Sequence, residues 1–358
     1  MSRNLLPFAL AAMLTAGAAG ADAPRVAVDI APVHSLVARV MDGVGTPSLV
    51  IAPGASPHEY SLRPSEAGAL QEADLVFWIG PELTPWLEDA MVTLAGDATA
   101  IALMEVEGTL RLPTRDGALF EAHAHGEMKA REDGHEHGHD HEHGHGHEDG
   151  HDDGHAHGEG HSHGEDHAEH ELAEHDHAKH EHGHGHAHDG DDPHVWLSPD
   201  NAGLWLGVIA DRLAEADPGN ADAYRANARA GQEELSALSS EIAATLAPLK
   251  GRNFIVFHDA YQYFEQAFEF PASGAISLSD ASDPSPARVA EIQKRVAEQG
   301  VSCVLAEPQF NKGIVAAVME GSEARTGVLD PMGTHLEPGP ALYPDMLRGL
   351  AAALAACL

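Results

Sequence analysis

Histidine is the residue type whose number and spacing most clearly predict chemistry in this chain of 358 residues. Of its 28 histidines, 23 lie between His123 and His188, mostly as His-x-His interleaved with Asp, Glu and Gly. Neutral imidazole binds borderline-soft metals, and the intervening carboxylates add charge and oxygen donors. The segment has too few apolar residues to offset the entropy of ordering it. We interpret residues 121–192 as a disordered, multivalent insert for Zn²⁺-like ions, although Ni²⁺ and Cu²⁺ also bind such composition.

A second histidine pattern lies outside the insert. His58 occurs in GASPHEYSLRPS after an expected strand, His194 in DPHVWLSPD before an expected helix, and His258 in FIVFHDAY at a strand end. Asp330, in GVLDPMG, also directly follows an expected strand. Ligands of open α/β sheets bind at the carboxyl ends of strands. These four residues recur at similar intervals once the insert is removed, as expected of one ligand per structural unit.

Three neutral imidazoles with a carboxylate or a water form a near-tetrahedral Zn²⁺ site, whereas Mn²⁺ prefers oxygen donors. We therefore predict a zinc site made of His58, His194, His258 and Asp330. The roles of the other nearby candidates stay open: Glu59 and Asp259 as alternative fourth donors, Glu307 as a residue that orients a ligand imidazole, His34 as a structural residue, and His335 as an outside candidate.

The elements that must position these residues alternate between strands and helices. Short apolar segments predict strands at 25–30, 48–52, 74–79, 253–257, 275–278, 301–305 and 326–329, with a further strand-like stretch near 110–120. Helical periodicity predicts helices at 33–41, 65–72, 200–216, 259–268, 286–299 and 313–320, with Ser65 capping the second and Ser198 or Asp200 the third.

One long amphipathic segment divides this alternation. It runs from Pro218 to about Leu246, and a helix of that length spans roughly 40 Å. The expected fold class is α/β, with two lobes of mostly parallel sheets flanked by helices, joined by one long rigid helix, and with the metal site in the cleft between the lobes. The expected division is a signal peptide at 1–21, an N-terminal lobe at 22–217 containing the insert, a linking helix at 218–248 and a C-terminal lobe at 249–358.

The compartment follows from the amino terminus and the cysteines. Arg3, an apolar run from Leu5 to Thr15, and small residues up to Ala21 are typical of a cleaved signal peptide, so we expect a periplasmic protein. The formal net charge of −37 argues against nucleic acid and anionic membranes as partners and favours cation capture. Cys303 and Cys357 are the only cysteines, and an even pair in an oxidising compartment predicts one disulfide, with two buried thiols as the alternative.

These motifs, together with ADLVFWIGPELTPWL and CVLAEPQF, resemble the metal-binding solute-binding proteins of bacterial ABC importers, closest to the zinc branch known as ZnuA. The resemblance covers nearly the whole mature chain. It implies two lobes joined by a rigid helix, Zn²⁺ as transported ligand, and delivery to a membrane permease. By position, His58, His194 and His258 match the three histidine ligands of the family. Asp330 matches the carboxylate that some members use.

The resemblance also refines several expectations. Manganese-binding members have a carboxylate at the position of His258, so at this position the chain resembles the zinc-binding members. Similar zinc proteins have a disulfide where Cys303 and Cys357 stand. Some members have Glu immediately before the first histidine, but here that residue is Pro57, which leaves Asp330 or water as fourth ligand.

We expect a monomer that is not an enzyme and does not insert into the membrane, with a periplasmic zinc chaperone as a further possible partner. A zinc hydrolase is the competing class, because three histidines with an open position can activate water. The chain has no His-Glu-x-x-His motif to support it. A zinc buffer that acts through the insert alone is the third interpretation.

Overall fold

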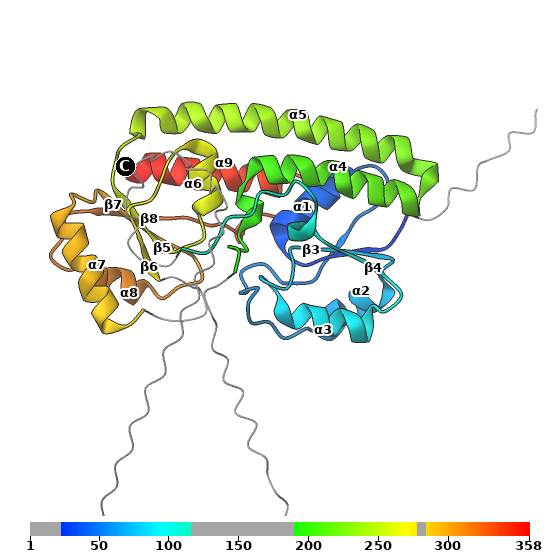
Figure 1. Ribbon diagram of the computed structural model, residues 1–358, viewed down its shortest axis with the longest axis horizontal. Coiled ribbons are helices and arrows are strands. Elements are labelled where there is room, and N and C mark those ends of the chain that lie inside the picture. Colours follow the sequence, from blue (N-terminus) through cyan, green and yellow to red (C-terminus); the bar gives the residue numbers. More distant parts are fainter. Residues whose placement is uncertain (1–22, 116–189, 278–283) are drawn as a thin grey trace, which may run out of the picture. The chain divides into compact units, whose positions relative to one another are not determined.

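The computed structural model describes residues 23–115, 190–277 and 284–358, and Figure 1 shows their arrangement in helices and strands. The predicted signal peptide and most of the predicted insert lie outside the described residues. Within the described ranges, no helix is both long and apolar enough to cross a membrane.

The first sheet has four parallel strands in the order β2-β1-β3-β4. The strands are β1 Val26–Val28, β2 Ser48–Leu49, β3 Leu75–Trp78 and β4 Thr99–Ala102. The helices between them are α1 Ala31–Val40, α2 Pro64–Glu72 and α3 Pro85–Leu94. Every residue of β1 and β3 is buried, which explains their continuous apolar sequences, because helices cover parallel sheets on both faces.

The second sheet repeats this topology in the order β6-β5-β7-β8, again with parallel strands. Its strands are β5 Phe254–His258, β6 Ala275–Ser277, β7 Cys303–Ala306 and β8 Arg325–Val328. Its helices are α6 Gln262–Phe268, α7 Pro286–Glu298 and α8 Lys312–Val318. A separate apolar cluster, which includes Phe257, Ile292 and Val315, packs α7 and α8 against this sheet.

Three longer helices connect the sheets. They are α4 Pro199–Ala216, α5 Ala221–Leu246 and α9 Leu342–Cys357. Helix α5 has 26 residues, which corresponds to a length of about 39 Å at 1.5 Å per residue. It contacts α1 and α4 in the first lobe, α6 in the second lobe, and the carboxyl-terminal helix α9 (Figure 1). The predicted fold class, two parallel-sheet α/β lobes with a long joining helix, is confirmed.

Helix α9 was not predicted, although it supplies a second connection between the lobes. It packs on α1, α5 and β8, and the Tyr343 amide donates to Ser35 Oγ at 2.9 Å. Tyr343 Oη also donates to the carbonyl of Trp196 at 2.7 Å. The chain therefore reaches the first lobe again at the start of α9, and α9 then leads back to the second sheet. The described residues also form four short 3-10 helices: η1 Leu103–Glu105, η2 Val195–Leu197, η3 Pro218–Asn220 and η4 Ala247–Leu249.

Some local predictions differ from the structure. Helix α2 is capped at Arg63 rather than Ser65, because Pro64 takes the first helical position, where its fixed φ is favourable and its missing N–H is harmless. Glu66 completes the cap by accepting from the Arg63 amide at 2.7 Å. The strand-like stretch near 110–120 forms, in its described part, only an isolated bridge between Pro113 and Asp191. Ser198 caps α4 as predicted, accepting from the Asn201 amide.

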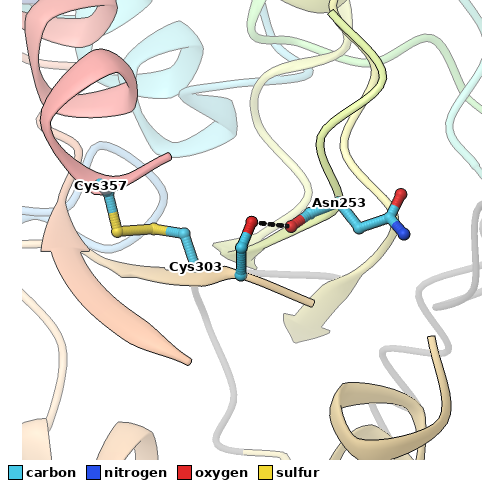
Figure 2. Close-up of a disulfide and its surroundings, with 4 residues drawn as sticks. Asn253, Cys303 and Cys357 are labelled. Carbon is cyan, nitrogen blue, oxygen red and sulfur yellow. Dashed lines mark hydrogen bonds between the residues drawn. A yellow bond between two sulfur atoms is a disulfide. The ribbon is translucent and has the colours of Figure 1, made fainter. Parts of the chain in front are cut away.

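The predicted disulfide joins Cys303 to Cys357, with the two Cα atoms 5.8 Å apart. Figure 2 shows how it ties the end of α9 to the start of β7, next to the hydrogen bond that Ser302, directly before β7, donates to the Asn253 carbonyl. Both cysteines are buried, so the bridge fixes the carboxyl-terminal helix to the second sheet from inside the core.

A buried carboxylate joins two strands of the first sheet at their carboxyl ends. Asp29 has no exposed surface, and its oxygens accept from the amides of Ile30 and Ile79, each at 2.7 Å. Burial raises the pKa of Asp29 from 3.8 to about 7 despite these hydrogen bonds. Asp29 therefore makes stability depend on pH.

We expect the Asp29 contribution to the free energy of unfolding to fall as pH rises from about 4 to about 7. Unfolded Asp29 releases its proton near its ordinary pKa, while the folded form holds it up to about pH 7, so the native state binds more protons in that window. The loss should reach at most about 4 kcal/mol. Urea unfolding of the parent and of Asp29→Asn at pH 4.5 and pH 8 measures it. Parallel stability profiles of the two proteins would contradict this assignment.

Candidate metal centre

Two of the predicted ligands, His194 and His258, lie side by side. Their Nε2 atoms are 3.3 Å apart, and their ring centroids are 5.2 Å apart. Two nitrogens bound to one tetrahedral Zn²⁺ at its usual bond length are separated by about 3.3 Å, and the ring centroids by about 5 Å. The pair therefore has the spacing that a single zinc ion requires.

Buried carboxylates hold both imidazoles in one orientation. The Nδ1–H of His194 donates to Asp192 Oδ1 at 2.7 Å, and that of His258 donates to Glu307 Oε1 at 2.6 Å. Carboxylates in this position fix the tautomer and the ring direction of metal-binding histidines. The unprotonated Nε2 atoms are then left to face each other. The proposed role of Glu307 in orienting an imidazole agrees with this contact, and Asp192 has the same role for His194.

The sheet topology explains why these groups meet. His258 is the last residue of β5, and Glu307 follows β7, its neighbour in the sheet. The carboxyl ends of parallel strands lie at one edge, so the two side chains converge there. His194 comes from the first lobe, directly before η2, and its ring is 5.2 Å from that of Trp196. The Trp196 indole donates to the Pro331 carbonyl at 2.9 Å and so anchors η2 to the segment after β8.

His58 belongs to the loop between β2 and α2. Its ring centroid is 6.2 Å from that of His194, about 1 Å beyond the separation of two imidazoles on one zinc ion. The same loop contributes Gly54 to Pro57 to a pocket that His194 and His258 also line. Gly54, with a φ of 82°, allows the chain to turn back, and Trp86 Nε1 donates to the Pro57 carbonyl at 2.8 Å. His58 therefore lies near His194 but farther from it than a second ligand of one zinc ion would be, and it is not among the residues that line the pocket.

Asp330 lies at the start of the segment that forms the opposite wall of the pocket. Its carboxylate accepts from the Met332 amide at 3.2 Å and from the amide and hydroxyl of Thr334 at 2.7 Å each. Met332 and Thr334 line the pocket, whereas Asp330 organises their turn. Each carboxylate oxygen has two lone pairs, so these bonds leave acceptor capacity for a metal. Among the residues that the structure describes, no group of three or more His, Cys, Asp or Glu side chains has the geometry of a complete metal site.

The remaining sequence candidates take other positions. Glu59 and His335 are exposed. His34 is buried in α1 with its Nε2 3.1 Å from the Pro47 carbonyl, and burial lowers its pKa, as expected of a structural histidine. Asp259 directly follows His258, but its carboxylate is bound by Arg115.

Sequence reasoning missed Asp192, Arg115 and Tyr261. Asp192 is recognisable only in retrospect, as an acid two residues before a ligand. Tyr261 is buried beneath the site, where burial raises its pKa well above the ordinary value, with the carboxylates of Glu307 and Asp330 adding to the shift. Asp192 contacts His194 and the Tyr261 ring lies 6.3 Å from that of His258, whereas Arg115 binds Asp259, the residue after His258.

Comparisons with known proteins show the family and the fold of the chain. The chain matches the family described as "Zinc-uptake complex component A periplasmic", ZnuA, over residues 26–357. It is 42% identical over 360 residues to the high-affinity zinc uptake system protein ZnuA of Brucella abortus (strain 2308), with 99% of each chain covered. It is 46% identical over 341 residues to the protein of that name from Paracoccus denitrificans (strain Pd 1222), covering 95% of this chain and 93% of the relative.

Solved structures show the same fold. A ZnuA crystal structure superimposes with a TM-score of 0.66 at 22% identity, covering 94% of this chain and 99% of the other. The periplasmic zinc binding protein TroA from Treponema pallidum gives a TM-score of 0.63 at 16% identity, with 94% and 99% covered. The family consists of transport components rather than enzymes, as the sequence predicted. The chain belongs to the ZnuA family, the periplasmic component A of zinc-uptake complexes.

Proposed function

We propose that this protein is a periplasmic receptor that binds one Zn²⁺ through His58, His194 and His258, with Asp330 or a water as the fourth donor. It then delivers the ion to the membrane permease of an ABC importer. Its relatives from Brucella and Paracoccus are named for high-affinity zinc uptake, which supports zinc as the cargo.

The observation that carries this proposal is the pair of facing imidazole nitrogens. With Asp192 and Glu307 accepting from the Nδ1–H groups, both Nε2 lone pairs point into the same space across 3.3 Å. Two lone pairs at that separation repel one another unless a cation lies between them. Deep burial removes water that would otherwise solvate them, since His258 is only 2% exposed. The arrangement is therefore built for a cation that prefers nitrogen donors, and Zn²⁺ fits this preference better than Mn²⁺.

The division of the chain supports a cleft receptor. We assign residues 22–217 to the first lobe, 218–248 to the linking helix and 249–358 to the second lobe, with a signal peptide cleaved near Ala21. His58 and His194 come from the first lobe and His258 and Asp330 from the second. An ion bound by both lobes holds them together, which gives a permease a means of distinguishing loaded from empty receptor. The receptor acts as a monomer, and a periplasmic zinc chaperone is a further possible donor or acceptor of the ion.

The histidine-rich insert has a separate, auxiliary role. We assign to residues 123–188 several weak zinc sites that raise the amount of zinc held near the receptor. Ligands that must be ordered on binding give lower affinity than ligands that the fold already positions. The insert is therefore a capture segment rather than the transport site.

Deletion of residues 123–186 should leave one tightly bound zinc and remove the weaker ones. Isothermal titration calorimetry of the parent and the deletion variant, with a competing chelator for the tight phase, measures both classes. If the deletion variant binds no zinc, the protein is a buffer that acts through the insert. If the weak sites persist, they belong to another part of the surface.

A further inference from the structure

An arginine stands where the insert joins the first lobe, and it binds two acidic side chains of the second lobe. Arg115 Nε donates to both oxygens of Asp259 at 2.9 Å, and its terminal nitrogens contact Asp259 and Glu265, with Arg115 Nη1 2.9 Å from Glu265 Oε2. The carboxylate side chains are 7% and 6% exposed, and that of Arg115 is 19% exposed. The guanidinium therefore supplies the positive charge for two buried carboxylates.

The position of Asp259 makes this pairing relevant to the metal. Asp259 directly follows His258 and is close enough to His194 and Asp192 to interact with both electrostatically. A carboxylate in that position is a potential oxygen donor next to a site of imidazoles. Each oxygen donor that replaces an imidazole moves a site's preference away from Zn²⁺ and towards Mn²⁺ or Ca²⁺.

Neighbouring contacts fix the place of Arg115. Gln262 Nε2 donates to the Pro113 carbonyl at 3.0 Å and to Asp192 Oδ2 at 3.2 Å. Helix α6 therefore contacts the chain both before and after the histidine-rich segment. Tyr263 Oη donates to the Asp192 carbonyl at 2.7 Å and accepts from the Leu112 amide at 3.0 Å. The segments that precede and follow the histidine-rich segment are thus bound to the start of α6, a few residues after His258 and Asp259.

We propose that Arg115 is a positioning residue that determines metal specificity: by binding both oxygens of Asp259, it keeps this carboxylate out of the coordination sphere and reserves the site for imidazole. The inference rests on the proposed function, because it concerns the same metal site. Arginine suits this role because its planar fork binds carboxylates through two nitrogens and keeps its charge when buried.

The test measures zinc and manganese affinities by competition with a chelator in the full-length protein. Arg115→Met frees Asp259, so the ratio of zinc affinity to manganese affinity should fall by about tenfold or more, the scale on which groups behind the ligands act. The double variant Arg115→Met with Asp259→Asn also lacks the freed carboxylate, so its ratio should return to that of the parent. Asp259→Asn alone should leave it unchanged.

A matched control lies on the same stretch of chain. Arg111 pairs with Asp191 at 3.5 Å, and the two side chains are 52% and 36% exposed, so Arg111→Met removes an arginine near the insert and leaves unpaired only a carboxylate that is already accessible to water. The ratio of zinc affinity to manganese affinity in Arg111→Met should equal that of the parent. Melting temperatures establish that each variant is folded. If Arg115→Met does not fold, Arg115→Lys takes its place, alone and with Asp259→Asn, because lysine binds a carboxylate as a point charge and holds it less firmly.

The inference fails if the ratio is the same in the parent and the Arg115 variant, or if Asp259→Asn does not restore a lowered ratio. It also fails if Asp259→Asn alone weakens metal binding, since Asp259 would then already be a ligand. Failure of the proposed function gives a different result, because the parent itself would then lack a tight zinc site.

Discussion

Replacing His194 or His258 by Ala should raise the dissociation constant for Zn²⁺ by about 100-fold or more. The loss of groups that only orient a ligand already weakens metal binding by about 10- to 100-fold, and the loss of a ligand itself should exceed that range. His58→Ala should have a comparable effect, although its ring stands farther from His194 at 6.2 Å. Competitive titration against a chelator, in protein that lacks residues 123–186, measures the constants without interference from the insert.

His335→Ala is the matched control for these replacements. His335 is exposed and lies on the segment after β8 that also contributes to the pocket, so its removal tests a nearby imidazole that we place outside the site. It should bind zinc as tightly as the parent. If it loses affinity while His58→Ala does not, the third histidine of the site has been assigned to the wrong segment.

Removing the disulfide should give the largest change in stability. Cys303 and Cys357 are 54 residues apart in sequence, and closing a loop of that size restricts the unfolded chain by an amount equivalent to about 4 kcal/mol. In a chain of this size, the melting temperature of Cys303→Ala with Cys357→Ala should fall by about 6 °C. Reduction of the parent should produce a similar fall. Thermal denaturation followed by circular dichroism measures both.

Zinc affinity should survive the loss of the disulfide. Cys303 starts β7, and Glu307, which orients His258, follows the other end of that strand, so the bridge lies at the opposite edge of the sheet from the site. A loss of zinc affinity equal to that of a histidine variant would show that the bridge also sets the geometry of the site. An unchanged melting temperature would contradict its stabilising role.

The sequence was sufficient to predict the repeated α/β architecture because its parallel strands are buried and therefore apolar. The segments around Val26, Leu75, Phe254 and Cys303 are strands within a few residues of the expected ranges. Helix α3 and strand β4 were missed, because their burial is partial and their apolar periodicity is weak. Helix α9 is also absent from the helices that the sequence predicted.

The site was predictable where residue type alone carries the chemistry. Histidines at strand ends and loop ends were recognisable, and two of them meet as a metal requires. The groups around them were harder to recognise. Glu307 and Arg115 act through pairings between segments far apart in sequence, Glu307 with His258 and Arg115 with Asp259 and Glu265. Asp192 lies only two residues from His194, but nothing in its residue type distinguishes it from the neighbouring acids. Acidic and basic residues are common, and only the folded arrangement shows which of them are buried beside a ligand.

The most direct test of the metal site is the crystal structure of the zinc-loaded protein lacking residues 123–186, with anomalous diffraction data collected on both sides of the zinc absorption edge. We expect one strong anomalous peak bonded to Nε2 of His58, His194 and His258 at about 2.0–2.1 Å. The loop that carries His58 should have moved about 1 Å towards the other two histidines, and Asp259 should remain bound to Arg115. A peak elsewhere, or a zinc ion that lacks either His194 or His258 as a ligand, would contradict the assignment.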